Sequence, residues 1–427
     1  MYDIYTMKGL LIRLKGTFSF KVPSYGLASL ASVIKKKHDV EAIDCLATNI
    51  KQQELFKKID NSLSFIAFSC MYQTEVNLLM GFIKKLRLYH LTIKIIVGGL
   101  WATNNFRILL FSGADYVIIG EGENILLDLL DTLENRRSIR KIKGIAYIRG
   151  KQIIKNPPNE LISLDKLPII RCDSKIFNKY RYLETSRGCN HCCSFCFTTR
   201  FWGHQWRGKS ISRVILEFER AKKDGIRYIQ LIDDNFAGND PQRIEGICKY
   251  LIENKFDIRW GCSLRSDFVV DFPEKIRLMK RAGCDVIFIG FESMNNRILS
   301  AYSKAINVTI NMKALEILRN NKIFIYGSFI LGGPSENLEE MKKTIRFARK
   351  CDIISLCILN SQLKHNKKMK LLVYYIIQKE YIKHYFTLSL RLLFEKNRFM
   401  RYIILAKKAD ILFIFKRYLD YFGIKVN

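Results

Sequence analysis

The sequence predicts an α/β protein in which a doubly wound parallel sheet precedes a second series of strand–helix units and a basic helical tail. The chain has 427 residues, more than one hydrophobic core usually holds, and short apolar runs alternate with helical patterns up to about residue 360. The expected divisions are residues 1–140 for the first sheet, 141–180 for a linker, 181–360 for the second α/β domain and 361–427 for the tail.

The first 140 residues contain five short apolar runs separated by helical patterns, which is typical of parallel strands with helices on both faces of the sheet. These expected strands are residues 10–14, 40–44, 65–69, 93–97 and 116–119. Pro23 and Ser24 stand ahead of an apolar stripe and predict the start of the first helix.

Two glycine motifs stand directly after expected strands of this half. Gly98 and Gly99 follow the fourth run, and the sequence Gly-Glu-Gly-Glu from Gly120 follows the fifth. Glycine lets a ligand approach the backbone closely, and open α/β sheets bind ligands outside the carboxyl ends of their strands. The pattern predicts a ligand at this edge, and tight turns without a ligand are the alternative.

The connector at residues 141–180 has two hairpin-like strands, the pair Pro157-Pro158 and a leucine–proline stop at Pro168. Proline and turn residues in this density indicate a linker between domains.

Four cysteines lie within eight positions directly after this connector. Cys189, Cys193 and Cys196 have the spacing C-x3-C-x2-C, with Phe195 just before the third, and Cys192 lies outside that register. Three thiolates on one short loop can bind three irons of a [4Fe–4S] cluster and leave the fourth iron open to a small molecule. A zinc site or a disulfide is the alternative, but no second C-x2-C or H-x3-H follows to complete a zinc tetrahedron.

On this loop, and on the preceding Ser186-Arg187-Gly188, the sequence resembles the radical S-adenosylmethionine (radical SAM) superfamily. The resemblance implies a partial (β/α)6 radical SAM barrel in residues 181–360, with SAM bound at the open iron. It also implies that Cys189, Cys193 and Cys196 are the catalytic cluster ligands and that Phe195 packs near the adenine.

The N-terminal half resembles the Rossmann-like cobalamin (B12)-binding domain that precedes this barrel in one branch of the superfamily. The likeness rests on residues 23–31, 40–44, 97–99 and the Gly-Glu-Gly-Glu run. It implies a corrinoid on the carboxyl edge of the sheet, in contact with Ser69, Gly98, Gly99, Gly120, Glu121 and Gly122.

The sequence departs from one motif of the cobalamin-binding domains. Members that coordinate cobalt through histidine carry D-x-H-x-x-G after the second strand, whereas residues 44–49 read Asp-Cys-Leu-Ala-Thr-Asn. If cobalamin binds here, no imidazole from this motif holds the cobalt. The alternative to a cobalamin-binding domain is a Rossmann-like domain that serves only as a scaffold.

The second α/β domain is expected to have six strands, and polar residues follow several of them. The runs are residues 182–187, 228–233, 257–264, 286–292, 324–331 and 353–359. Asp233 and Asp234 are expected to bind the ammonium or ribose of SAM, Arg265 to clamp a carboxylate, and Glu292 to accept from an ammonium or hydroxyl group. A helix N-cap is the alternative for the aspartates, and structural ion pairing is the alternative for Arg265 and Glu292.

The fifth of these strands continues into a glycine-rich turn. Residues 327–334 resemble the family's G-x-F-I-L-G-x-P run, in which Gly327 and Gly332 lie along the adenine. The sixth strand departs from the branch, because no proline-glycine-threonine loop follows it.

The formal net charge of +31 is extreme, and residues 361–427 carry 15 Lys or Arg against 4 Asp or Glu. Nucleic acid is a possible but not favoured partner, since abundant Lys, Ile, Asn and Tyr together also follow from an AT-rich coding bias. Helices that cover the barrel, or an anionic partner, are the alternatives for the tail. No secretory signal or apolar run of about 18 residues is evident, and scattered cysteines indicate a cytoplasmic protein.

The resemblance implies an enzyme that takes one electron from an external flavodoxin- or ferredoxin-type donor and cleaves SAM to a 5′-deoxyadenosyl radical. Cobalamin-dependent methylation of a small-molecule substrate at an unactivated carbon is the expected outcome, and ring formation or rearrangement are others. A transfer-RNA-modifying methylthiotransferase and a non-catalytic SAM- or corrinoid-binding protein are the alternatives.

Overall fold

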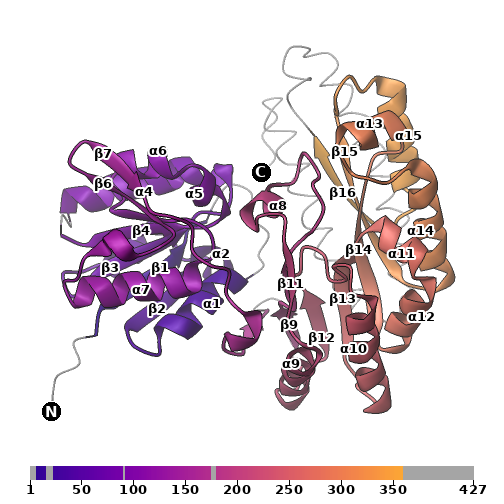
Figure 1. Cartoon of the computed structure of the whole chain (residues 1–427), viewed down its shortest axis with the longest axis horizontal. Coiled ribbons are helices and arrows are strands. Elements are labelled where there is room, and N and C mark those ends of the chain that lie inside the picture. Colours follow the sequence, from indigo (N-terminus) through magenta and orange to yellow (C-terminus); the bar gives the residue numbers. More distant parts are fainter. Residues whose placement is uncertain (1–5, 16–22, 90–91, 175–178, 359–427) are drawn as a thin grey trace, which may run out of the picture. The chain divides into compact units, whose positions relative to one another are not determined.

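The computed structural model describes residues 6–15, 23–89, 92–174 and 179–358. The chain divides into two compact units, which Figure 1 shows coloured along the sequence. The first unit comprises Met1–Cys189 and Phe197–Arg213, and the second comprises Asn190–Cys196 and Val214–Asn427. The tail predicted at residues 361–427 lies outside the described residues.

The first unit contains a seven-stranded sheet in the order β2-β1-β3-β4-β5-β6-β7. Its strands are β1 (Lys8–Arg13), β2 (Asp39–Asp44), β3 (Phe65–Ser69), β4 (Lys94–Gly98), β5 (Tyr116–Ile118), β6 (Ile145–Arg149) and β7 (Gln152–Lys155). Strands β1 to β5 are parallel, and they confirm the five predicted runs. The strand order reverses between β1 and β3, which is where open α/β sheets bind ligands.

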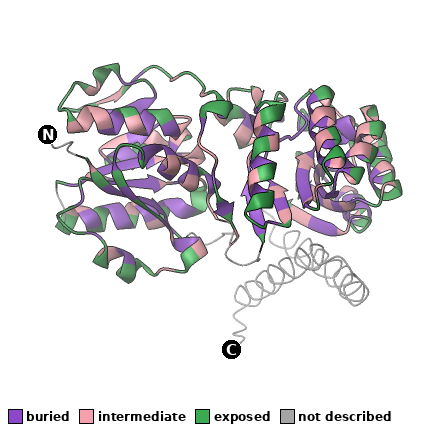
Figure 2. Cartoon of the chain, turned by 90° about the horizontal axis from the view of Figure 1, so that it is seen from below, coloured by how far each residue is buried: buried purple, intermediate pink, exposed green. Residues whose placement is uncertain are grey.

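Helices cover both faces of this sheet because its central strands β1, β3, β4 and β5 are apolar on both sides. Leu10 and Ile12 belong to one buried cluster, whereas Leu11, between them, belongs to the other. The central strands are accordingly buried, and exposed residues lie on the outer helix faces (Figure 2). The helices are α1 (Tyr25–Ile34), α2 (Cys45–Thr48), α3 (Gln52–Lys57), α4 (Gln73–Tyr89), α5 (Leu100–Asn104), α6 (Phe106–Phe111) and α7 (Gly122–Glu134). The predicted doubly wound sheet is confirmed.

The hairpin of β6 and β7 corrects the expected linker at 141–180. Strand β6 pairs antiparallel with β5, and β7 with β6, so residues 145–155 extend the first sheet. An unpaired edge exposes backbone N–H and C=O groups, and the hairpin satisfies those of β5. The first unit also contains the short antiparallel pairs β8 (Cys172–Asp173) with β9 (Tyr180–Leu183) and β10 (Ser186–Gly188) with β11 (Trp206–Gly208).

The second unit contains five parallel strands in the order β16-β15-β14-β13-β12. They are β12 (Tyr228–Leu231), β13 (Arg259–Leu264), β14 (Cys284–Glu292), β15 (Phe324–Leu331) and β16 (Ile353–Ile358). They confirm five of the six predicted runs, and the run at 182–187 divides into β9 and β10.

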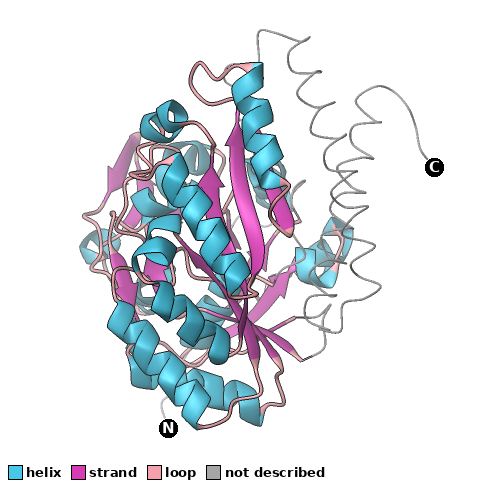
Figure 3. Cartoon of the chain, turned by 90° about the vertical axis from the view of Figure 1, so that its right-hand side faces the viewer, coloured by secondary structure: helices cyan, strands magenta, loops and turns pink. Residues whose placement is uncertain are grey.

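Helices follow the strands of the second unit and lie along one face of its sheet (Figure 3). They are α10 (Pro241–Glu253), α11 (Ser266–Asp271), α12 (Pro273–Arg281), α13 (Asn296–Ala301), α14 (Val308–Asn320) and α15 (Leu338–Ala348). Helix α8 (Phe197–Phe201) belongs to the first unit, and the division between the units falls within α9 (Ile211–Lys223), after Arg213. This arrangement leaves the loops after the strands to build a site at their carboxyl ends.

Candidate active site

The four clustered cysteines lie on the loop between β10 and α8. Cys193 is buried, Cys189 and Cys196 are half-buried, and Cys192 is exposed. The backbone N–H of Cys196 donates to the carbonyl of Cys193 at 3.1 Å, which makes a tight turn of this part of the loop. No disulfide joins any of the chain's twelve cysteines, all of which lie within the described residues. Three thiols on one short loop suit a [4Fe–4S] cluster, and the triad remains the predicted ligand set.

The middle of this loop is anchored to the segment that follows α13. The backbone N–H of Ser194 donates to the carbonyl of Tyr302 at 2.9 Å, and its hydroxyl donates to the carbonyl of Ala301 at 3.3 Å. The ring of Phe195 packs edge-on against Tyr302 with ring centroids 5.2 Å apart, and Lys304 Nζ lies 5.9 Å from the centroid of Phe195. Phe195 therefore serves as an anchor, a role that the sequence did not reveal.

Arg265, which directly follows β13, points to the cluster loop. Its Nη1 lies 3.8 Å from Cys193 Sγ, and its Nη2 donates to the carbonyl of Lys304 at 2.8 Å. Its Nη2 also forms an ion pair with Asp267 at 2.7 Å. Burial opposes ionisation of Asp267, but the hydrogen bonds from Arg265 outweigh it and lower the pKa of Asp267. Arg265 thus binds the carboxylate of Asp267. This contact agrees with the structural ion pair that the sequence left as the alternative role of Arg265.

Glu292, at the end of β14, forms a buried ion pair with Lys304 at 3.1 Å. Each side chain is only 7% exposed. Glu292 has a left-handed backbone, with φ of 65°, at the point where the pairing of β14 with β15 shifts register. A Cβ atom at Gly290 would overlap the Glu292 carboxylate, so a side chain there would displace this ion pair. Strained residues of this kind concentrate at functional sites, where the surrounding structure holds them in place.

The turn after β15 is held by Glu336. Its Oε2 accepts from the backbone N–H of Gly332 at 2.7 Å and of Gly333 at 3.0 Å. Burial raises the pKa of Glu336 against the effect of these two hydrogen bonds. A Cβ atom at Gly333 would lie 2.6 Å from Tyr302 Oη. This turn therefore lies next to Tyr302, the residue that holds the cysteine loop. Glu336 therefore occupies the N–H groups of the glycine turn. An adenine would contact the backbone of this turn through van der Waals packing and not through these N–H groups.

Gly327 lies in the middle of β15 rather than at its end. It pairs with Ile289 of β14 and with Ile354 of β16, and a Cβ atom there would lie 2.5 Å from Cys351 Sγ. This glycine makes room for the core residue Cys351, so the expectation that Gly327 lies along the adenine stays without support from its surroundings.

The two aspartates after β12 differ in exposure. Asp233 is buried and Asp234 is exposed. Helix α10 begins later, and its N-cap is Asp240, whose carboxylate accepts from the backbone N–H of Arg243 at 2.9 Å. The N-cap alternative is therefore wrong for Asp233 and Asp234, and SAM binding remains their predicted role.

The carboxyl ends of four strands meet at one edge of the first sheet. Arg13 is in register with Asp44 of β2 and with Ser69 of β3, and Ser69 is in register with Gly98 of β4. Asp44 accepts from the backbone N–H of Ala47 at 3.2 Å and caps α2. Leu46, which stands where the histidine of D-x-H-x-x-G would be, is buried in the core at 4% exposure. This position therefore presents no metal ligand.

The glycines of this edge differ in what surrounds them. A Cβ atom at Gly120 would meet nothing within 4 Å, whereas one at Gly99 would lie 2.6 Å from the carbonyl oxygen of Cys70, and one at Gly122 would lie 3.0 Å from Leu30. Gly120 thus leaves the backbone open to a ligand at this edge, whereas a Cβ atom at Gly98 would lie 3.5 Å from Ile118. Gly99 and Gly122 serve close packing of the chain itself.

The carboxylate of Glu121, expected to contact cobalamin, is engaged elsewhere. Its Oε1 accepts from Arg187 at 2.9 Å and from Arg207 at 2.6 Å, and its Oε2 accepts from the backbone N–H of Ile162 at 2.8 Å. Glu123 also binds Arg187. The sequence did not reveal this pairing, although two acidic residues in one turn and an arginine before Cys189 were its visible signal.

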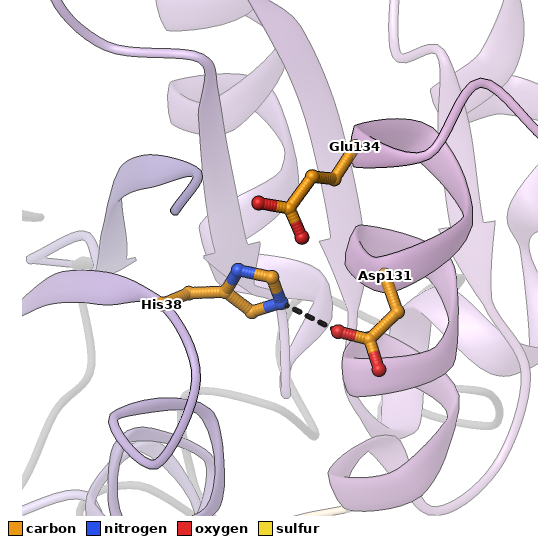
Figure 4. A group of neighbouring side chains, drawn as sticks. All are labelled: His38, Asp131 and Glu134. Atoms are coloured by element: carbon orange, nitrogen blue, oxygen red, sulfur yellow. Dashed lines mark hydrogen bonds and ion pairs between the residues drawn. The ribbon is translucent and has the colours of Figure 1, made fainter. Parts of the chain in front are cut away.

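A further group of possible metal ligands joins the turn after α1 to α7 (Figure 4). His38 Nε2 lies 3.0 Å from Asp131 Oδ1, and Glu134 completes the group. Lys37 Nζ forms an ion pair with Asp131 at 2.6 Å. Because Lys37 and His38 already satisfy Asp131, we assign this group to the packing of the turn after α1 against α7.

Two family models match the chain. The model of the radical SAM superfamily matches residues 183–348, and that of the B12 binding domain matches residues 14–130. Within the described ranges no helix is long and apolar enough to cross a membrane.

Several curated proteins are similar in sequence. An uncharacterized methyltransferase of Pyrococcus horikoshii is 32% identical over 346 residues, which are 78% of this chain and 74% of that protein. An anaerobic magnesium-protoporphyrin IX monomethyl ester cyclase of a Synechocystis species is 28% identical over 55% of this chain and 49% of its own length. The hopanoid C-3 methylase of Methylococcus capsulatus is 28% identical over 48% of this chain and 40% of its own length. The chain thus spans half or less of the latter two proteins.

Two solved structures have the same fold. The radical SAM methyltransferase TsrM of Kitasatospora setae, with cobalamin and a [4Fe-4S] cluster bound, superposes with a TM-score of 0.72 and 16% identity, covering 83% of this chain and 75% of that chain. The cobalamin-dependent radical SAM enzyme OxsB gives a TM-score of 0.70 and 22% identity, covering 84% and 54%. At these identities the likeness shows the fold.

Proposed function

The chain belongs to the radical SAM superfamily and carries a B12-binding domain, and on that premise we propose that it is a cobalamin-dependent methyltransferase. The observation that carries the proposal is the carboxyl edge of the first sheet, where Ser69 and Gly98 end neighbouring strands and a Cβ atom at Gly120 would meet nothing within 4 Å. The substrate would be a small molecule with an unactivated carbon. The family makes the [4Fe–4S] cluster, SAM and cobalamin the expected cofactors.

When bound, the cluster supplies the electron that cleaves SAM to methionine and a 5′-deoxyadenosyl radical, and cobalamin supplies the methyl group. The chain's own residues bind and orient. Cys189, Cys193 and Cys196 would hold the cluster, and Arg265 would hold Cys193 in place through its 3.8 Å contact with the sulfur. Glu292 and Lys304 would present a fixed pair of charges at the strand ends.

Each cleavage consumes one electron, so the proposal includes an external one-electron donor of the flavodoxin or ferredoxin type. The formal net charge of +31 supports an acidic donor, because opposite charges speed the encounter of two proteins.

A methylthiotransferase is the second candidate, because a putative methylthiotransferase of Methanocaldococcus jannaschii is 26% identical over 75% of this chain and 70% of its own length. Such enzymes would need a second set of three cluster cysteines in the N-terminal part. Only Cys45 and Cys70 precede Cys172 in the sequence, and both are buried. Burial raises the pKa of Cys45 to about 11 and that of Cys70 to about 12, which disfavours the thiolates that bind iron.

Anaerobic reconstitution with iron, sulfide and hydroxocobalamin, followed by reduction in the presence of SAM, tests the proposal. We expect 5′-deoxyadenosine together with S-adenosylhomocysteine, since the second product records transfer of a methyl group from SAM. Cys193→Ser is the control for the cluster. Formation of 5′-deoxyadenosine alone, unchanged by hydroxocobalamin, would leave a radical SAM enzyme and refute the methyltransferase.

We expect Arg265→Gln to lower the reduction potential of the cluster and to leave the affinity for SAM within about twofold. An N–H donor to a ligand sulfur stabilises the reduced cluster, so its loss should shift the potential by on the order of 50 mV, or about 1.2 kcal/mol for one electron. Potentiometric titration followed by electron paramagnetic resonance measures the shift, and equilibrium binding measures the affinity for SAM.

The exposed Arg277→Gln on α12 is the matched control, because it removes the same charge away from the loop. Arg265→Lys keeps the charge and should shift the potential less. An unchanged potential with SAM binding weakened about tenfold would instead assign Arg265 to the carboxylate of SAM, as the sequence suggested.

A further inference from the structure

Arg187 is the centre of a buried cluster of ion pairs in the first unit. Its Nη1 donates to Glu121 at 2.9 Å, its Nη2 to Glu123 at 2.7 Å, and its Nε to Glu184 at 2.9 Å. The Arg187 side chain is 5% exposed. All five donors of a guanidinium point in fixed directions, so three carboxylates around it define its position closely.

Two further cations lie beside this cluster. Arg207 is directly opposite Arg187 in the pairing of β10 with β11 and binds Glu121 at 2.6 Å, and Lys209 acts electrostatically on Glu184. Burial raises the pKa of Glu184 to about 7, and the charges of Arg187 and Lys209 oppose this shift. A buried charge is costly unless it is paired, and these contacts supply the partners.

A glycine is required directly after Arg187. The following Gly188 has a φ of 84°, and a Cβ atom there would overlap the carbonyl oxygen of Gln205. The guanidinium groups of Arg187 and Arg207 lie 5.5 and 5.8 Å from the ring centroid of Trp202. The chain is therefore fixed immediately before Cys189, the first of the predicted cluster ligands.

On its other side, the ion-pair cluster around Arg187 includes residues of the glycine turn at the sheet edge. Glu121 and Glu123 flank Gly122 at the start of α7, directly after the open position at Gly120. The hydroxyl of Ser29 on α1 donates to Glu123 at 2.7 Å and ties the turn to the helix layer. The same two carboxylates thus belong to the turn expected to meet the corrinoid and hold the arginine two residues before Cys189.

We propose that Arg187 is a positioning residue that couples corrinoid binding at the Gly120–Glu123 turn to assembly of the cluster at Cys189. This inference rests on the proposed function. A ligand that orders the turn fixes Glu121 and Glu123, which fix Arg187 and the start of the cluster loop. Coupling is reciprocal, so a bound cluster must strengthen corrinoid binding by the same factor.

The test is the dissociation constant of hydroxocobalamin, measured for the full chain with and without the reconstituted cluster. We expect the wild type to bind at least about fivefold more tightly when the cluster is present. In Arg187→Lys, which keeps the charge and loses the three-way contact, the ratio should fall to about one. Glu123→Gln is a second variant, with the same shape and one charge fewer, and should reduce the ratio in part.

Glu160→Gln is the control, because Glu160 pairs with Lys143 at the surface and is 90% exposed. Loss of iron to a chelator gives a readout without the corrinoid: hydroxocobalamin should slow it in the wild type and not in Arg187→Lys. An equal ratio in the wild type and Arg187→Lys, or a ratio of one in the wild type, would overturn the coupling and leave the methyltransferase intact. A wild type that binds no hydroxocobalamin would overturn the methyltransferase itself.

Discussion

Replacing Cys189, Cys193 or Cys196 with serine is expected to reduce 5′-deoxyadenosine formation at least about a hundredfold, because even outer-sphere changes at metal sites cost 10- to 100-fold. Serine does not ionise at neutral pH and offers a hard oxygen in place of a soft thiolate, so it holds iron of a cluster poorly. Iron and sulfide content after reconstitution, together with the product assay, measures the effect.

Cys192→Ser is the matched control on the same loop. The Cys192 side chain is exposed, whereas Cys193 beside it is buried against Arg265. The variant should keep the iron content and the product yield of the wild type. An equal loss at Cys192 would show that the register of the three ligands is wrong. Circular dichroism of each apoprotein separates loss of the cluster from loss of folding.

Lys304→Met is expected to destabilise the chain by about 3–5 kcal/mol, because it leaves Glu292 buried without its partner. The Glu292 side chain is only 7% exposed, so little water reaches the carboxylate that remains. Chemical denaturation of the apoprotein, followed through the tryptophan fluorescence, measures the change in the free energy of unfolding.

The double variant Glu292→Gln with Lys304→Met should recover part of this loss, because no uncompensated charge remains. Lys342→Met is the control, since Lys342 and its partner Glu339 lie at the surface, 33% and 70% exposed, and such pairs contribute about 0–1 kcal/mol. A loss at Lys304 no greater than that at Lys342 would mean that the buried pair does not stabilise the strand ends.

The sequence predicted the strands of both units because each is a short apolar run bounded by turn residues, and the structure confirms them. It was less successful where one run serves two elements. Residues 182–187 looked like one strand and form parts of β9 and β10, and the hairpin of β6 and β7 looked like a linker and completes the first sheet. Pairing between strands depends on what lies opposite, which a single sequence does not display.

The site shows the same division. The spacing of Cys189, Cys193 and Cys196 is local, so the sequence alone indicates the chemistry of the loop. The partners of the charged residues are separated by long stretches of chain: Arg265 lies 72 residues from Cys193, and Arg187 lies 66 from Glu121. Those pairs arise only when strands bring their ends together. They show that Arg265 and Glu121, which the sequence assigned to ligand binding, are engaged with other residues of the chain.

By itself, the sequence determined that two α/β parts follow one another, and it identified the cysteine triad and the small residues at the strand ends. Each of these features depends only on local spacing or periodicity. The tertiary structure alone decided which of those residues are engaged. It placed Gly327 in a packed core, and it paired the backbone N–H of Gly332 with Glu336. It also paired Glu121 and Glu123 with Arg187. The physical reason is that buried polar groups must find partners, and these partners come from distant parts of the chain.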